Sequence, residues 1–295
     1  LNLADYRKLS VPLLQGLSRL LYLLSNFFNL TLGEKLLEHL RRWTDPETIN
    51  KAKAFKPGDE IKIPGAILSL FHLLPPAPTK FLDQLVTVTM DLDAGLPGSS
   101  PGGRFWSQFR EALLPYINRH APEAVNYFLD RLADTRHFRM LLSYVKWPDA
   151  DPVRKELATL APKLLMCSFE PEKAAAAARQ AVAAQAAQVA AHTAAVAAAP
   201  AGAPPPAPPP PGPPQIATQA PTPAKVAELR VQGIVLVHAL VKRVPYLLTE
   251  YPAVLSKLVE LWTSEERKQR LKQEEHTPLE QLGESKLLVK CFVSY

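Results

Sequence analysis

The chain has 295 residues, of which 47% are hydrophobic and 21% are charged, so it carries enough apolar residues for a continuous core. No apolar run approaches the roughly 18 residues that a membrane span requires. The two cysteines, Cys167 and Cys291, lack the CxxC spacing of a zinc site and lie among apolar residues, which is typical of buried, reduced thiols. The formal net charge of +6 permits attraction to acidic partners but does not specify nucleic acid.

The first 62 residues predict two amphipathic helices followed by a polar segment. The first helix should start near Pro12, and its expected inner face consists of Leu13, Leu17, Leu20, Leu21 and Leu24. Thr31 and Glu34 form a capping-box pattern that predicts the start of the second helix. Its expected inner face consists of Leu36, Leu37, Leu40 and Trp43. Residues 44–62 are polar, and we expect an irregular loop there with a turn at 57–59.

Proline and glycine mark the limits of the next helices. Pro64 is expected to open a third helix, which the proline-rich run at 75–78 ends because proline lacks a backbone donor. Thr79 is expected to cap a fourth helix, and residues 95–103 predict a glycine-rich loop. The apolar stripes of these two helices consist of Ile67, Leu70, Phe71 and Leu74, and of Phe81, Leu82, Leu85 and Val86.

Residues 105–170 predict four more helices. One covers about 105–117, and Pro122 begins the next. Asp134 or Thr135 should cap the third, which ends before Trp147, and a single helix is expected from Asp151 onward. The stripes consist of Val125, Phe128, Leu129 and Leu132; Phe138, Leu141, Leu142 and Val145; and Val153, Leu157, Leu160 and Leu164. Since one such stripe cannot bury itself alone, each helix must lie against a neighbour.

These short, paired helices predict an all-α fold, an α-solenoid of HEAT-like antiparallel helix pairs over residues 1–170. The composition then changes abruptly. Residues 173–198 are dominated by alanine, and residues 199–215 are dominated by proline. We expect residues 171–223 to be a disordered or semi-rigid linker, with at most transient helix in the alanine-rich part. A plain spacer is the main interpretation, and docking of the proline run to an SH3- or WW-type domain is the alternative.

HEAT-like repeats are expected to continue over residues 224–295. One stripe consists of Leu229, Gly233, Val237, Leu240 and Val244, and the next, after Pro252, of Val254, Leu255, Leu258, Leu261 and Trp262. The charged run from Glu265 suits a solvated helix face or a loop. A last helix should start near Glu284. The chain begins with Leu1 rather than methionine and ends inside an amphipathic run, so we expect a piece of a longer protein, truncated at its C-terminus.

No motif points to catalysis. His72 and His238 lie in apolar helices without a second ligand at i+4, which favours core histidines over metal ligands, and His120 and His137 are expected at the surface. The glycine-rich loop lacks the Lys-Ser/Thr ending of a phosphate-binding loop. We therefore predict no catalytic, cofactor-binding or metal-binding residues, and no cofactor.

A cluster of basic residues surrounds the expected loop at 44–62. It consists of Arg41, Arg42, Lys51, Lys53, Lys56 and Lys62. Acidic residues interrupt this cluster, and its aromatic neighbours are only Trp43, which continues an apolar stripe, and Phe55. A nucleic-acid surface needs a basic stripe with stacking aromatic residues. We therefore expect no direct contact with nucleic acid, and no membrane contact.

Several segments resemble the transformation/transcription domain-associated protein (TRRAP) family. They are DYRKLSVPLLQGLSRLLYLLSNFF (5–28), EKLLEHLRRW (34–43), IPGAILSLFHLLPPAP (63–78), FREALLPYINRHAPEAVNYFLDRL (109–132), LVELWTSEERKQR (258–270) and ESKLLVKCFVSY (284–295). The resemblance covers most of both blocks of predicted helices, in order. These are helix-packing sequences, so the resemblance rests on their number and order, and no family site residue is carried over. The tract at 171–223 departs from the family pattern and gains no function from it.

The resemblance implies a large scaffold related to phosphatidylinositol 3-kinase-related kinases that has lost kinase activity. It implies the HEAT-repeat region of a nuclear, SAGA-like histone acetyltransferase coactivator subunit. The expected partners are other protein subunits of that complex and segments of transcription activators. Two alternatives remain: the same region of an active kinase of this superfamily, and an unrelated α-solenoid adaptor.

Overall fold

The structure of the chain is a computed structural model, in which residues 10–23, 30–96, 107–198, 220–273 and 283–293 are described. The described residues form helices joined by turns, and no strand occurs among them. The predicted fold class, an all-α solenoid of HEAT-like helix pairs, is confirmed.

The chain divides into two compact units. The first comprises Leu1–Tyr127 and Arg139–Glu156, and the second comprises Phe128–Phe138 and Leu157–Tyr295. Their limits fall inside helices of the middle of the chain. The helices that lie in the first unit, wholly or in part, are α1 (Val11–Leu23), α2 (Leu30–Arg42), α3 (Pro46–Phe55), α4 (Asp59–Leu70), the 3₁₀ helix η3 (Phe71–Leu73), α5 (Pro78–Ala94), α6 (Gln108–Arg119), α7 (Ala121–Asp130), α8 (Thr135–Lys146) and α9 (Asp151–Thr159).

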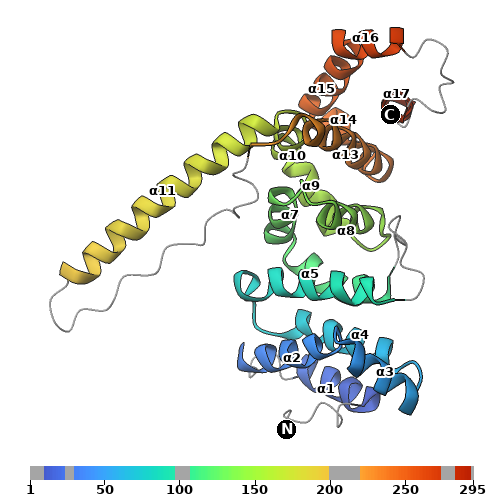
Figure 1. The fold of residues 1–295 in the computed structure, drawn as a ribbon, viewed down its shortest axis with the longest axis vertical. Helices are drawn as coiled ribbons and strands as arrows, with labels where there is room; N and C mark the ends of the chain where they lie inside the picture. Colours follow the sequence, from blue (N-terminus) through green and yellow to red (C-terminus); the bar gives the residue numbers. More distant parts are fainter. Residues whose placement is uncertain (1–9, 24–29, 97–106, 199–219, 274–282, 294–295) are drawn as a thin grey trace. The chain divides into compact units, whose positions relative to one another are not determined.

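Helix α4 is central to the packing of the first unit. It lies against α1, α2, α3 and α6, and Figure 1 shows it beside α2. The core next to it is aromatic, since the Phe71 ring meets the edges of the Phe81 and Tyr116 rings at centroid distances of 5.7 and 6.5 Å. Gly33 allows α2 to approach this core, because a Cβ there would lie 2.6 Å from the Phe81 ring.

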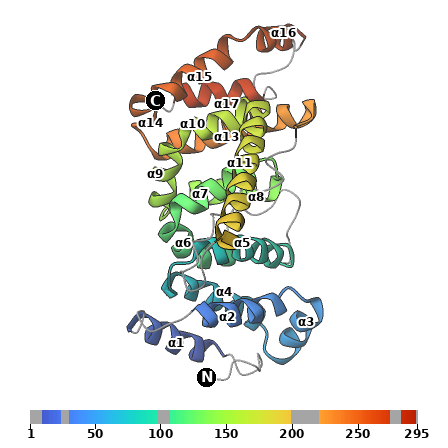
Figure 2. The ribbon, with the colours of Figure 1, turned by 90° about the vertical axis from the view of Figure 1, so that its left-hand side faces the viewer.

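The second unit is built around α13 (Pro223–Arg243), which packs against α10 (Ala161–Phe169) and α17 (Gly283–Val293), as Figure 2 shows. The other helices of this unit are α11 (Pro171–Ala198), α14 (Leu247–Glu250), α15 (Pro252–Thr263) and α16 (Glu265–Gln273). Gly233 sets the closeness of α13 and α10, because a Cβ there would lie only 2.4 Å from the Ser168 Cβ. The charged run from Glu265 forms α16. The last helix, α17, begins at Gly283, next to the predicted start near Glu284.

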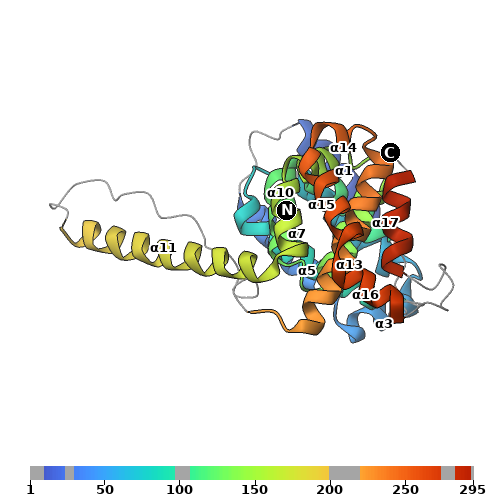
Figure 3. The same ribbon diagram turned by 90° about the horizontal axis from the view of Figure 1, so that it is seen from above.

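In the alanine-rich part of the expected disordered or semi-rigid linker, where at most transient helix was expected, Pro171–Ala198 forms the 28-residue helix α11. Alanine has the highest helix propensity, and this length exceeds what an isolated helix needs. Figure 3 shows this helix, which we call the alanine arm, leaving α10 and α13. Pro171 and Ala175 are buried at its base. The proline run at 199–219 lies outside the described residues, so its expected character as a spacer stays a prediction.

The expected loop at 44–62 is also wrong, because α3 and the start of α4 occupy it. Asp45 caps α3, since its Oδ2 accepts from the Thr48 backbone nitrogen (3.0 Å) and hydroxyl (2.8 Å), and Pro46 follows as a good first residue. The turn at 57–59 is confirmed, and Gly58 supplies its left-handed conformation with φ +96°. Pro64 therefore lies inside α4 instead of opening a helix.

Three other boundaries differ from the prediction. Thr31 lies inside α2, which begins at Leu30, so it does not cap that helix. Thr79 lies inside α5, whose N-cap is Ala77, because Pro78 already has the φ of a first helical residue. The single helix expected from Asp151 onward is two helices, since Pro162 has no N–H for the bond that would join α9 to α10.

The apolar stripes are largely confirmed. All four residues of the Val125–Leu132 stripe are buried, as are those of the stripes Ile67–Leu74 and Leu229–Val244. Among the side chains of α1 that the structure describes, Leu14 and Leu17 are buried and Leu20 keeps 45% of its surface exposed, whereas Leu21 and Leu24 of the predicted stripe lie outside them. Leucine occupies neighbouring faces of this helix, so periodicity alone could not select between Leu13 and Leu14. The predicted blocks, 1–170 and 224–295, do not coincide with the two compact units. Each helix of a solenoid packs mainly on its neighbours in sequence, so a solenoid has no sharp boundary that the sequence could mark.

Candidate interaction surface

His72, His120 and His137 make mostly local contacts within the described helices. His120 and His137, expected at the surface, are buried at 5% and 8% exposure. His137 Nδ1 lies 2.9 Å from Asp134 Oδ2, and its ring meets Phe128 edge-on. Asp134 also accepts from the Arg136 backbone nitrogen, so this pair caps the start of α8.

A second histidine environment lies in the first unit. The His120 ring is 4.8 Å from the Tyr116 ring, and His72 Nδ1 lies 2.6 Å from the Ser69 carbonyl oxygen. Burial lowers the pKa of both His72 and His120, and the nearby Arg119 charge lowers it further. Neutral imidazoles in these positions act as packing groups. Within the described ranges, no group of three or more His, Cys, Asp and Glu side chains could hold a metal ion.

Both cysteines are free thiols in apolar surroundings. Cys291 is buried and Cys167 is half-buried. Burial raises the pKa of Cys167 to about 11 and the pKa of Cys291 to about 12. Since the thiolate is the reactive form, neither environment favours a nucleophile.

The basic cluster around α3 is exposed and interleaved with acidic side chains. Arg42 pairs with Glu38 at 3.3 Å, and Lys51 pairs with Glu47 at the same distance. Arg41 donates to Gln84 on α5. Arg42 and Lys51 thus pair with carboxylates of their own helices, whereas the Gln84 partner of Arg41 is neutral. The absence of nucleic-acid contact stays a prediction. Among the residues that the structure describes, no helix is long and apolar enough to cross a membrane.

Three arginines donate to backbone carbonyls at the ends of preceding helices, which the sequence patterns did not reveal. The Arg154 guanidinium is 4% exposed and donates to the carbonyls of Val145 (3.2 Å), Trp147 and Pro148 (2.7 Å), and to the Asp151 carboxylate. The last carbonyls of a helix lack intrahelical partners. Arg154 therefore satisfies the end of α8 and fixes the turn that leads into α9.

The other two arginines act in the same way. Arg119 donates to the carbonyls of His72 and Leu74 at the end of η3. Arg267 donates to the Trp262 carbonyl at 2.7 Å, and its guanidinium lies 3.5 Å from the centroid of the Trp262 ring. Arg267 Nε also donates to Ser285 on α17. These arginines therefore supply donors to carbonyls at the ends of three helices.

An ion-paired clasp joins α5 to the start of α6. Arg110 Nε donates to Asp93 Oδ2 at 2.5 Å, and the Ser107 hydroxyl donates to the same carboxylate. The Ser107 Oγ also caps α6 by accepting from the Phe109 nitrogen at 3.1 Å. The clasp thus fixes both ends of the glycine-rich segment, whose residues 97–106 lie outside the described residues.

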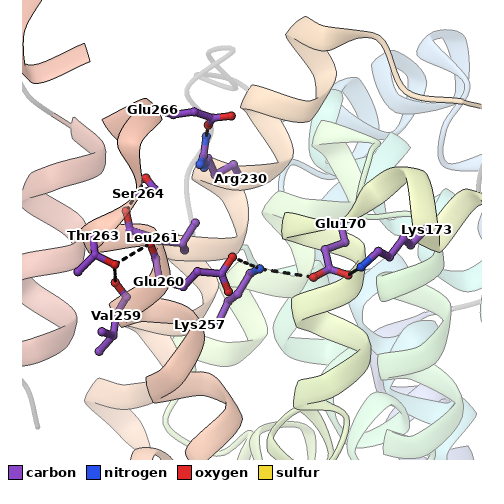
Figure 4. A network of polar contacts seen from close by, with 10 residues as sticks. All are labelled: Glu170, Lys173, Arg230, Lys257, Val259, Glu260, Leu261, Thr263, Ser264 and Glu266. Carbon is purple, nitrogen blue, oxygen red and sulfur yellow. Dashed lines mark hydrogen bonds and ion pairs between the residues drawn. The ribbon is translucent and has the colours of Figure 1, made fainter. Parts of the chain in front are cut away.

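A polar network fixes the base of the alanine arm, as Figure 4 shows. Lys257 on α15 lies between Glu170 (3.5 Å) and Glu260 (2.8 Å), and Glu170 also pairs with Lys173 in the first turn of the arm (2.8 Å). The hydrogen bond from Lys173 and its charge lower the pKa of Glu170, so this carboxylate stays ionised. The network thus connects α15 with the turn between α10 and the arm.

A second part of the network joins three helices of the same unit. Arg230 on α13 pairs with Glu266 on α16 at 2.9 Å and with Glu284 on α17 at 3.5 Å. Figure 4 shows the first of these pairs beside the α15–α16 turn. Glu266 keeps 71% of its side-chain surface exposed, so its pair with Arg230 adds little stability, whereas Arg230 and Glu284 each keep only 19%.

Each compact unit exposes large apolar side chains singly, which is normal for a protein surface. They include Tyr22, Val231, Tyr246 and Val259, and the arm adds Val182 and Val189. Among the polar side chains described above, Arg154, Arg119 and Arg267 close helix ends.

Comparison with known proteins also indicates a chain built of helical repeats. The sequence model of the family described as "Tra1 HEAT repeat ring region" matches residues 1–295. A relative from Dictyostelium discoideum, "Probable transcription-associated protein 1", is 28% identical over 300 residues, which cover 100% of this chain and 5% of the relative.

Two further relatives match about half of the chain. The "Transformation/transcription domain-associated protein" of Mus musculus is 33% identical over 53% of this chain and 6% of its own length. The "SAGA complex/NuA4 acetyltransferase complex subunit TRA1" of Saccharomyces cerevisiae is 34% identical over 54% of this chain and 4% of its own length. The chain therefore spans only about a twentieth of the length of these relatives.

Proposed function

Because this chain belongs to the Tra1 HEAT repeat ring family, we propose that it is a non-catalytic scaffold segment of a transcription coactivator subunit in a SAGA-like histone acetyltransferase complex. The observation that carries the proposal is the family match over residues 1–295, which spans both compact units. The yeast relative's name places that protein in the SAGA and NuA4 acetyltransferase complexes. The corresponding subcellular location proposed for this chain is the nucleus.

The proposed mechanism is display of helical surface. Within each compact unit, the turns closed by arginine and, in the first unit, the clasp at Asp93 connect successive helices. Other subunits of the complex would bind these faces. Segments of transcription activators would dock as short amphipathic helices in grooves between repeats. Nucleic acid and membranes are not among the proposed partners.

The absence of catalysis is part of the same proposal. Its support is that Arg154 and Asp134 act at helix ends, where they satisfy backbone groups. A kinase of the same superfamily would carry its active site elsewhere in the chain. If the full-length protein had kinase activity, the proposal that it is a coactivator subunit would be wrong, whereas the proposal that this segment is a scaffold would stand.

Affinity purification from nuclear extract tests the proposal. The full-length protein is tagged and compared with a version that lacks the segment equivalent to 1–295, and with a control that lacks only residues 176–219 of the arm and proline run. We expect acetyltransferase-complex subunits to co-purify with the full-length protein and the control, and a subset of them to be lost without the segment. Recovery of vesicle or cytoskeletal proteins instead would contradict the proposal.

A further inference from the structure

Thr222 is an exposed residue in extended backbone directly before α13. Ala220 before it and Pro223 after it are exposed as well. Its backbone has φ −71° and ψ 157°, which is the extended conformation that a following proline favours. Among the residues that the structure describes, Thr222 is the only serine or threonine that a proline directly follows. These two properties, an extended backbone and a proline at the next position, distinguish this hydroxyl from the other described hydroxyls.

The residues after Thr222 have the pattern that proline-directed protein kinases recognise. Pro223 occupies the next position, and Lys225 lies three positions after the hydroxyl. Such kinases take a serine or threonine whose next residue lacks a backbone N–H, and members of this class select a basic residue three positions on by its charge. The sequence Thr-Pro-Ala-Lys meets both requirements.

A kinase can reach this hydroxyl without opening the core. Kinases bind their substrates as extended chain, so the first turn of α13 has to unwind. No residue of that turn, 223–226, is buried, and the first buried side chain of the helix is Leu229. Unwinding breaks the cap in which Thr222 Oγ1 accepts from the Lys225 nitrogen at 3.3 Å, and the bond from the Val226 nitrogen to the Thr222 carbonyl at 2.9 Å. Because helix ends fray at low cost, the hydroxyl is accessible in the folded chain.

We propose that Thr222 is a phosphorylation site for a proline-directed protein kinase that uses ATP. In the reaction, Thr222 Oγ1 attacks the γ-phosphorus of ATP and forms a new P–O bond. The bond from that phosphorus to the β,γ-bridging oxygen breaks, and ADP leaves. The hydroxyl proton passes to the aspartate base of the kinase. The product carries about two negative charges at pH 7 in place of a neutral hydroxyl.

The phosphate would lie beside positive groups that are already present at the start of α13. The first turn of a helix has N–H groups without intrahelical partners, and the helix dipole favours negative charge there. Lys225 adds a full positive charge, and its Nζ pairs with Glu228 Oε2 at 2.8 Å. Glu228 Oε1 also accepts from Thr135 and from Gln232, each at 2.9 Å, so this carboxylate keeps partners when Lys225 turns toward the phosphate. Phosphorylation therefore strengthens the start of α13.

Treatment of the 295-residue chain with ATP and a cyclin-dependent kinase tests the proposal, with a standard substrate peptide as the control for kinase activity. The sequence itself offers two comparison sites, because Ser100 and Thr277 also precede proline but have glycine and glutamate at the third following position. We expect mass spectrometry to show Thr222 phosphorylated at least tenfold faster than either of them. If the active kinase left Thr222 unmodified, or modified the comparison sites equally fast, the proposal would be overturned.

Three variants assign the recognition to individual residues. Thr222→Ala should remove the phosphate from this segment. Pro223→Ala keeps the hydroxyl but restores a backbone N–H, and it should slow phosphorylation at least tenfold. Lys225→Ala removes the basic residue and should slow phosphorylation severalfold. A Pro223→Ala variant that is phosphorylated as fast as the wild type would show that the hydroxyl is not a proline-directed site.

Hydrogen exchange measures the consequence for α13. In the chain phosphorylated at Thr222, we expect exchange at residues 225–228 to become about fivefold slower, and exchange beyond residue 234 to stay unchanged. The same phosphate in the Lys225→Met variant should slow exchange less than twofold, because the ammonium group is missing. Unchanged or faster exchange after phosphorylation of the wild-type chain would contradict contact of the phosphate with Lys225 and the first turn.

Discussion

Replacing Arg154 should destabilise the end of α8 more than any exposed substitution nearby. Its buried guanidinium serves three backbone carbonyls and one carboxylate. Arg154→Met keeps most of the aliphatic stem but leaves those carbonyls without their donor. An unsatisfied buried polar group costs about 1–3 kcal/mol, and partial access of water reduces the sum, so we expect a loss of about 3–4 kcal/mol in the free energy of unfolding.

Two further variants separate the carbonyl bonds from the ion pair. Asp151 is largely exposed, so Asp151→Asn should cost less than about 1 kcal/mol. Arg154→Lys retains the charge but cannot reach several carbonyls at once, and it should lie between Arg154→Met and the wild type. Lys155→Met, at an exposed position, is the control and should change stability by less than about 0.5 kcal/mol.

The assay is urea unfolding of the 295-residue chain followed by circular dichroism, together with hydrogen exchange of the α8 and α9 amides. Faster exchange should be confined to these two helices and the Trp147–Ala150 turn between them. If Arg154→Met lost less than about 1 kcal/mol, or if Asp151→Asn lost as much as it did, the arginine would not be acting as a cap for helix carbonyls.

Three other outcomes follow from the packing. Gly233→Ala should destabilise the second unit by about 1–3 kcal/mol in urea unfolding, because its Cβ would lie 2.4 Å from the Ser168 Cβ. The control is Gly65→Ala inside α4, where a Cβ would meet nothing within 4 Å, and it should be neutral or stabilising. Equal losses of stability in the two variants would show that the approach of α13 to α10 is not tight. Burial lowers the pKa of His72 and His120 below the ordinary value of 6.5, so the unfolded chain binds more protons than the folded chain. The free energy of unfolding should therefore fall as pH decreases from about 7 to 5. The double variant His72→Gln/His120→Gln should lose less of this free energy between pH 7.5 and 5.5, and an unchanged loss would refute this cause. Deletion of residues 176–219 should shift the melting temperature of the remaining helices by no more than about 2 °C, because the buried residues of the arm lie at its base; a larger drop would show that the tract supports the core.

The sequence predicted helices well where apolar spacing was unambiguous. Val125, Phe128, Leu129 and Leu132 occupy one face of a helix whose other face is polar, and all four are buried. In α1, leucines lie on adjacent faces, so the pattern could not choose the buried one. The helix at 46–55 was missed because its stripe is weak and its start depends on the Asp45 cap, a local hydrogen bond in a segment that looked merely polar.

The polar contacts of the buried arginine and histidine side chains could not be predicted from sequence. Arg154 contacts carbonyls six to nine residues earlier in the chain, and backbone carbonyls carry no sequence signal. Arg267 was placed within a solvated charged run, yet it is 8% exposed and lies over Trp262. His137 looked like a surface residue because it follows two polar residues, whereas its ring faces Phe128 across the start of α8.

Cross-linking mass spectrometry of the native complex tests the central claim most directly. The full-length protein is purified from nuclear extract with its partners and treated with a lysine-reactive cross-linker. The segment offers exposed lysines in both units, including Lys35, Lys53, Lys242 and Lys290. If the segment is a scaffold, these lysines should cross-link to other subunits of an acetyltransferase complex. If cross-links to such subunits form from other parts of the protein but none form from this segment, the claim that it presents a binding surface is contradicted.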